Sequence, residues 1–157
     1  RAGELIAIAT PGHTPDHVAF HWPDARAVFV GDLMLGGMDT ALVAPPEGDL
    51  AAYLDSLERV RALRPATLIP AHGDPFDDAD GAIDRYIAHR RARLDRVREA
   101  LEAARPHAVT PSQITRAVYG PDLDDHLRAA AEAATLAYLH WLERTGQAFR
   151  KGERWHA

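Results

Sequence analysis

The chain contains no cysteine, and this absence removes three kinds of chemistry at once. Disulfide bonds, thiolate metal ligands and a cysteine nucleophile are all excluded. The sequence also has no uninterrupted apolar run that approaches the roughly 20 residues of a membrane-spanning helix, and no signal-peptide segment is visible. We therefore expect a protein without a membrane anchor, with the cytoplasm as its default location.

An excess of charge of one sign is also missing. The 157 residues are 46% hydrophobic and 26% charged, with a formal net charge of −5, which is typical of a soluble globular protein. Because the chain is not basic throughout, any contact with nucleic acid must be local. The length predicts one domain, or one domain with a small appendage.

Three apolar segments each end in a turn that carries one histidine or aspartate. Residues 5–9 lead to His13, residues 28–30 lead to Asp32, and residues 67–69 lead to His72. Apolar runs that stop at Pro or Gly are typical of buried strands that end abruptly. Imidazole and carboxylate groups at rigid strand ends suit a zinc or mixed divalent metal site, so the sequence predicts such a site.

Each of these residues also has a common alternative role. His13 alone is more often a loop histidine, Asp32 alone more often closes a turn or caps a helix, and His72 before a glycine is the weakest signal. His17 is either a strand residue at the sheet edge or a group that orients a metal ligand or polarises substrate. The sequence leaves both interpretations of His17 open.

The first two thirds of the chain show alternating strand and helix signals. We expect strands at residues 5–9, 17–22, 27–30 and 67–69. A helix is expected from Leu50 to about Leu63, with Asp49 as its N-cap and an apolar face. That face is formed by Leu50, Leu54, Leu57 and Val60. A long helix capped by residues 77–80 should run to about Ala104, and the pattern indicates half of a sheet with helices laid on it.

The last third has a different pattern. Arg105-Pro106 breaks the long helix and predicts a boundary between a domain at 1–105 and a domain at 106–157. A helix is expected after Thr110, and a second one from about Asp124 to Arg144, followed by Gly146 and short strands at 147–150 and 153–156. The expected core positions of the second helix are Leu127, Leu136, Leu139 and Leu142.

This order of helix, turn, longer helix and hairpin is a small winged-helix pattern. The generic use of that pattern is DNA binding, but the second helix is rich in alanine and has few side chains that could read bases. A protein-packing or substrate-guiding module is therefore the favoured interpretation.

Together, the three turns resemble the metal motifs of the metallo-β-lactamase superfamily. Pro11–Thr14 matches its Pro-Gly-His-Thr loop, Asp32 matches its aspartate after a strand, and Ala71–Gly73 matches its histidine turn. With its tail, the chain is similar to the β-lactamase-like protein 2 group from about Leu5 to Trp155. The resemblance implies an α/β (α+β) fold: the C-terminal half of an αββα sandwich, followed by a small winged-helix-like domain.

The family's first metal motif, His-x-His-x-Asp-His, is absent from this sequence. Only Asp16-His17 and Asp125-His126 occur, each without the preceding His-x-His. In the family the motif lies N-terminal to the Pro-Gly-His loop, so we expect the missing half outside this chain or on a second chain. A half sandwich leaves an apolar sheet face uncovered, which predicts homodimerisation, aggregation or domain swapping.

The resemblance also implies the chemistry. Two zinc ions roughly 3.5–4 Å apart would turn a bridging water into hydroxide in a complete site. His13 would bind the first metal, His72 the second, and Asp32 both; Asp32 and His17 are the catalytic candidates. Three ligands divided between two metals should hold zinc far more weakly than a complete site, so we expect this chain alone to be a poor hydrolase.

Three functions remain open at this point. The first is a zinc hydrolase that acts on RNA phosphodiesters or on a small-molecule ester or thioester. The second is a glyoxalase II-like thioesterase, which the expected hairpin disfavours. The third is a non-enzymatic winged-helix binding module. Substitution of His13, Asp32 and His72 separates the enzymes from the module, because binding through the tail should survive.

Overall fold

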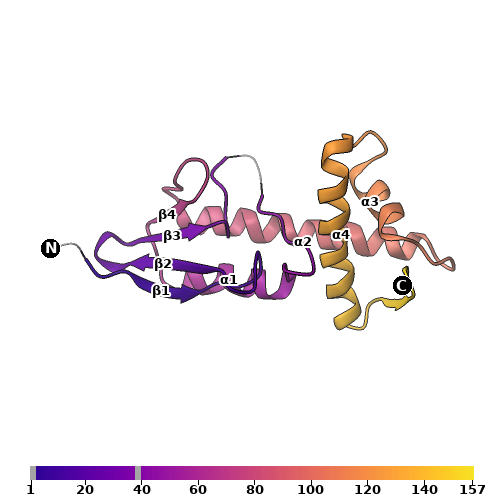
Figure 1. The fold of residues 1–157 in the computed structure, drawn as a ribbon, viewed down its shortest axis with the longest axis horizontal. Helices are drawn as coiled ribbons and strands as arrows, with labels where there is room; N and C mark the ends of the chain where they lie inside the picture. The colour runs from indigo at the N-terminus through magenta and orange to yellow at the C-terminus, as the bar shows by residue number, and fades with distance from the viewer. Residues whose placement is uncertain (1–2, 38–39) are drawn as a thin grey trace. The chain divides into compact units, whose positions relative to one another are not determined.

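The structure is a computed structural model that describes residues 3–37 and 40–157 (Figure 1). It contains two compact units. The first comprises Arg1–Val43 and Glu47–His89, and the second comprises Ala44–Pro46 and Arg90–Ala157. Helix α2 (Ala79–Ala103) contributes residues to both. The two units divide within α2, between His89 and Arg90. The domain boundary that we predicted from the sequence, at 105/106, stays a prediction.

The first unit is built on a four-stranded sheet. Its strands are β1 (Ile6–Ala9), β2 (Val18–Trp22), β3 (Ala27–Gly31) and β4 (Thr67–Pro70), in that spatial order. The first two pairs are antiparallel, and β3 and β4 are parallel, with α1 (Leu50–Ala62) between them in the chain (Figure 1). Strands β1, β3 and β4 therefore run in the same direction and end at the same edge of the sheet.

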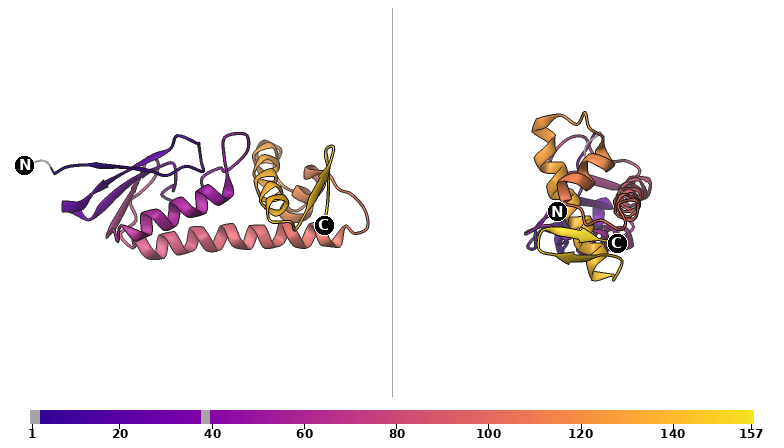
Figure 2. Two further views of the ribbon diagram at one scale, coloured as in Figure 1. Left: turned by 90° about the horizontal axis from the view of Figure 1, so that it is seen from below. Right: turned by 90° about the vertical axis from the view of Figure 1, so that its right-hand side faces the viewer.

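Helix α1 forms where the sequence predicts it. The side chain of Asp49 accepts a hydrogen bond from the backbone N–H of Ala52 at 2.9 Å, which caps the first turn. The helix lies along one face of the sheet (Figure 2) and buries one apolar side, formed by Leu50, Tyr53, Leu57 and Val60. Leu54, which we expected on this side, is only partly buried.

The opposite face of the sheet is apolar and exposed. Val18, Phe20, Phe29 and Ile69 line a shallow hollow of about 210 Å³ on it. Phe20 is 44% exposed, whereas Ala19, its neighbour on the other face, is fully buried. Within the described part of the first unit, no helix covers this face (Figure 2).

The second unit contains α3 (Pro111–Tyr119), α4 (Asp125–Arg144) and a hairpin of β5 (Phe149–Lys151) and β6 (Arg154–His156). Thr110 and Gln113 form the capping box that begins α3. Gly146 follows α4 with a φ of 71°, as expected for the residue that ends a helix in the left-handed region. The helix–helix–hairpin order is confirmed, although β5 begins two residues later than the sequence indicated.

One predicted core position of α4 is wrong, and another, Leu136, is only partly buried. Leu127 is 49% exposed, whereas Leu139 and Leu142 of the same helix are buried. Helix α4 has 20 residues and α3 has nine, so α4 extends beyond the helix on which it packs. Leu127 lies in the first turn of α4. The helical spacing of apolar residues continues into this turn, but α3, on which α4 packs, does not extend that far.

None of the helices in the described ranges combines the length and the apolar character that crossing a bilayer requires.

Candidate metal centre

The sheet topology places the four candidate residues at one edge. His13, Asp32 and His72 follow β1, β3 and β4, which end at this edge. His17 precedes β2, which runs in the opposite direction and therefore begins at the same edge. Residues from distant parts of the sequence are thus gathered by strand order.

Asp32 and His72 lie side by side. Nε2 of His72 is 3.6 Å from Oδ1 of Asp32, and both side chains are accessible to solvent. Their loops are tied together by backbone hydrogen bonds: the N–H of Ala71 donates to the carbonyl of Gly31 at 3.0 Å, and the N–H of Gly36 donates to the carbonyl of His72 at 2.8 Å. The pair is therefore held by the backbone as well as by its own contact.

Two glycines allow this close approach of the loops. Gly73 has a φ of 81°, and a Cβ at this position would overlap the carbonyl of Gly36. A Cβ on Gly36 would in turn overlap the backbone of Asp74. Any side chain at either position would push apart the loops that carry Asp32 and His72.

His17 is partly buried. Its Nδ1 lies 2.8 Å from the hydroxyl oxygen of Thr10, which is fully buried. Burial lowers the pKa of His17, the neighbouring His13 lowers it further, and Thr10, Asp32 and Asp16 partly oppose the shift. The lowered pKa favours the neutral imidazole, which is the form that accepts a proton or binds a metal.

Sequence reasoning missed Thr10. This residue precedes the Pro-Gly-His loop, and its N–H donates to the carbonyl of His17 at 2.9 Å. The pairing of Ala9 with Val18 brings the two residues together. A polar residue directly before the loop is a weak signal, and only the strand register shows that its hydroxyl meets an imidazole.

His13 is oriented by a backbone carbonyl. Its Nδ1 lies 2.7 Å from the carbonyl oxygen of Leu42, which can only accept, so Nδ1 carries the proton and Nε2 is the free acceptor. The rings of His13 and His17 meet edge to face, with centroids 6.4 Å apart.

The loop that carries His13 is anchored on α1. Gly12 has a φ of 132°, and a Cβ there would overlap the backbone of Tyr53. The hydroxyl of Ser56 donates to the carbonyl of Pro11 at 2.7 Å, and the N–H of Asp49 donates to the carbonyl of Gly12 at 3.0 Å. Pro-Gly before the histidine therefore serves close packing on the helix.

These donors do not amount to a complete metal site. Across residues 3–37 and 40–157, no group of three or more His, Asp or Glu side chains is arranged to hold a metal ion. A catalytic zinc ion has three protein ligands, whereas Asp32 and His72 provide a close pair. The assignment of His13, Asp32 and His72 as ligands stays a prediction.

Two family models match separate parts of the chain. Residues 3–72 match the model described as "Metallo-beta-lactamase superfamily", and residues 110–155 match the "Beta-lactamase associated winged helix domain". The first match includes all four candidate residues, and the second covers α3, α4 and the hairpin as far as Trp155.

Two curated relatives share about a third of their residues with the aligned part of this chain. One is the "Beta-lactamase-like protein 2 homolog" of Caenorhabditis elegans, 35% identical over 73% of this chain and 37% of that protein. Another is the "Atrochrysone carboxyl ACP thioesterase" of Aspergillus fumigatus, 32% identical over 80% of this chain and 31% of that protein. The chain thus spans about a third of the length of these relatives.

Two solved structures resemble almost the whole chain. A metallo-beta-lactamase family protein from Thermus thermophilus is 25% identical with a TM-score of 0.81, and 99% of this chain covers 52% of it. A beta-lactamase domain protein from Burkholderia ambifaria is 27% identical with a TM-score of 0.83, and 99% of this chain covers 51% of it. The predicted mixed α/β fold with a C-terminal winged helix is confirmed.

Proposed function

Because residues 3–72 belong to the metallo-β-lactamase superfamily and residues 110–155 to its associated winged-helix family, we propose that the chain supplies part of the site of a metal-dependent hydrolase. Zinc is the metal that we expect, because imidazole and carboxylate groups are among its common ligands. The remaining donors would come from polypeptide beyond these 157 residues or from a second chain.

The contact between Asp32 and His72 is the observation that carries this proposal. Its 3.6 Å separation brings a carboxylate oxygen and an imidazole nitrogen of two different loops together at an exposed edge. Two glycines in crowded positions, Gly36 and Gly73, hold these loops in contact.

The other two histidines would act around this pair. His13 presents Nε2, because its Nδ1 is committed to the Leu42 carbonyl. His17 is held by Thr10 and would orient the neighbouring groups or a substrate rather than react itself. Both are proposals for these positions.

Esters and thioesters are the substrate class that we propose. The support is the name of one relative, which is called a thioesterase. The part of this chain that is similar to that relative amounts to 80% of the 157 residues. RNA phosphodiesters are the competing class, and a binding module without activity is the non-enzymatic alternative. Substrate choice therefore has to be measured.

The first experiment measures zinc binding and turnover together. Isothermal titration of the 157-residue chain with zinc should show weak binding that falls at least about tenfold in Asp32→Ala and in His72→Ala, since each removes half of the donor pair. Release of free thiol from an acyl thioester, cleavage of a p-nitrophenyl ester and cleavage of single-stranded RNA should be followed with zinc present. We expect slow thioester or ester turnover that the same two substitutions abolish.

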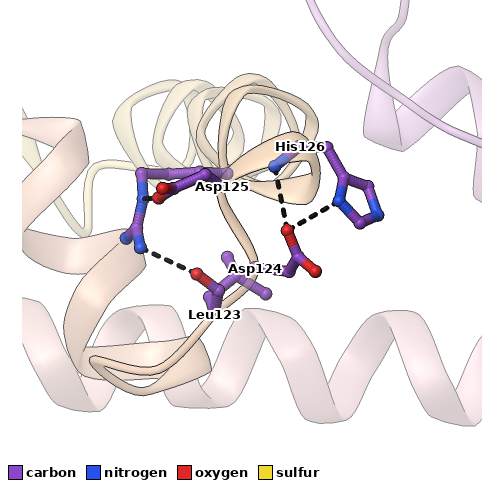
Figure 3. A network of polar contacts seen from close by, with 5 residues as sticks. Leu123, Asp124, Asp125 and His126 are labelled. Carbon is purple, nitrogen blue, oxygen red and sulfur yellow. Dashed lines mark hydrogen bonds and ion pairs between the residues drawn. The ribbon is translucent and has the colours of Figure 1, made fainter.

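The second unit offers a matched control. His126 and Asp124 also form a histidine–carboxylate pair, with Nδ1 and Oδ1 2.6 Å apart (Figure 3). This pair lies at the start of α4, where Asp124 caps the helix. His126→Ala should leave zinc binding and turnover unchanged. Two tightly bound zinc ions with fast turnover would refute the partial site, and zinc binding that survives loss of Asp32 and His72 would refute the assigned donors.

A further inference from the structure

The C-terminal hairpin of the second unit carries a surface that the proposed hydrolase site does not use. Strands β5 and β6 pair with Phe149 opposite His156 and Lys151 opposite Arg154. Side chains alternate between the two faces of a strand, so these four residues share one face. Trp155 is on the other face, where it is 1% exposed and forms part of the core.

Phe149 and His156 form a flat aromatic platform on this outer face. Their rings are parallel to within 1°, with centroids 4.6 Å apart. Phe149 is nevertheless 57% exposed, so it presents aromatic surface to solvent while its partner keeps it in place. A single exposed apolar residue needs no explanation, but a preorganised stack can accept another planar ring at little entropic cost.

Cationic groups surround the platform. Arg105 lines a hollow of about 280 Å³ together with His107, Phe149 and His156. Lys151 and Arg154 continue the positive charge along the hairpin, and Nη1 of Arg154 donates to the carbonyl of Ala108 at 2.9 Å, which orients the guanidinium. In a chain with a net charge of −5, this is a local concentration of positive charge with Glu153 as the acidic residue at its tip.

We propose that this hairpin face binds single-stranded nucleic acid, with a base stacked on Phe149 and phosphates held by Arg105, Lys151 and Arg154. Aromatic platforms flanked by cations accept bases of any type, because every base has a π-face. A duplex keeps those faces inside its own stack. Cations placed both at the hollow and along the hairpin fit a strand with successive phosphates better than a free nucleotide. The hairpin shares no residue with the Asp32–His72 pair, so the proposal is independent of the proposed hydrolase.

Binding can be measured by the fluorescence anisotropy of labelled single-stranded RNA and DNA of one sequence, about 12 nucleotides long, with EDTA present so that metal-dependent cleavage plays no part. The 157-residue chain should bind single strands in a saturable way. Phe149→Ala should weaken binding about fivefold to a hundredfold, and Phe149→Trp should preserve it. The logarithm of the binding constant should fall linearly with the logarithm of the salt concentration. Lys151→Gln should make this slope shallower by about 0.7, which is the value for one phosphate contact on a single strand.

The chain has one lysine, which allows the contact to be located directly. Acetylation of Lys151 by an N-hydroxysuccinimide ester, followed by mass spectrometry, should slow when the oligonucleotide is bound. Leu127→Ala removes another exposed apolar side chain of the same unit and is the matched control. This variant should bind the oligonucleotide as tightly as the chain without substitutions. Circular dichroism verifies that each variant is folded.

Four results would overturn the proposal. They are equal binding of a duplex, unchanged binding by a folded Phe149→Ala variant, unchanged acetylation of Lys151, and displacement of the strand by poly-glutamate or by ADP at matched charge concentration. A preference for RNA over DNA, or the reverse, would support the proposal and identify the strand that binds.

Discussion

Gly73 is the single residue on which the contact between Asp32 and His72 depends most directly. Alanine at this position would be strained at a φ of 81° and would also overlap the Gly36 carbonyl. We expect Gly73→Ala to lower the free energy of unfolding by more than about 2 kcal/mol, because a left-handed backbone and overpacking each carry a cost. Chemical denaturation followed by circular dichroism measures this loss.

Gly146 provides the control for that substitution. Its φ is 71°, but a Cβ there would meet no atom within 4 Å. Gly146→Ala should therefore lose only the conformational part, about 1 kcal/mol. Equal losses at the two positions would mean that the close approach of the Gly36 and Gly73 loops does not hold the candidate site.

Tyr119 gives a pH-dependent prediction at the same scale. Burial raises its pKa above 10.0, and the guanidinium of Arg93, 4.0 Å from the ring centroid, only partly offsets the shift. Because the ionised form is disfavoured in the folded state, the stabilisation by neutral Tyr119 is complete below about pH 10 and is lost as the pH rises through the folded pKa. Tyr119→Phe should lose less stability than the unmodified chain on going from about pH 9 to pH 11.

Absorbance at 295 nm checks the origin of that difference. The chain contains four tyrosines, so the titration curve of Tyr119→Phe subtracted from that of the unmodified chain isolates one phenol. A midpoint at or below the ordinary value would contradict the role of burial.

Among the elements, α3 depends on the cap that begins it. The hydroxyl of Thr110 accepts a hydrogen bond from the Gln113 N–H at 3.3 Å, and the Gln113 side chain accepts one from the Thr110 N–H at 2.9 Å. Thr110→Ala should lower the free energy of unfolding by about 1 kcal/mol, because helix N–H groups lose their acceptor. Thermal denaturation measures this, and Thr110→Ser should remain within a few tenths of the unmodified chain. Destabilisation by serine as large as that by alanine would count against the cap.

At the scale of the whole molecule, the uncovered sheet face is the main liability. Val18, Phe20 and Phe29 lie on a face that no helix of the described first unit covers, so we expect the chain to self-associate through it. Phe20→Ser should shift sedimentation-velocity profiles toward the monomer at high protein concentration. Leu127→Ser, at an exposed leucine of the second unit, should leave them unchanged. Association that responds to Leu127 rather than Phe20 would place the interface elsewhere.

The sequence by itself determined the elements and the strand ends that the candidate residues follow. Strand ends are marked by Pro and Gly within a few residues of the apolar run, so the positions of His13, Asp32 and His72 could be predicted locally. The cap at Asp49, the helix start at Thr110 and the helix end at Gly146 are likewise signals carried by neighbouring residues.

Only the tertiary structure decided which of these residues meet. The contact of Thr10 with His17 depends on strand register, and that of Gly36 with Gly73 depends on two loops far apart in the chain. Leu127 shows the same limit, since periodicity indicates a face but not what packs on it. Local patterns record backbone preferences, whereas contacts between distant segments follow from packing, which short-range sequence does not contain.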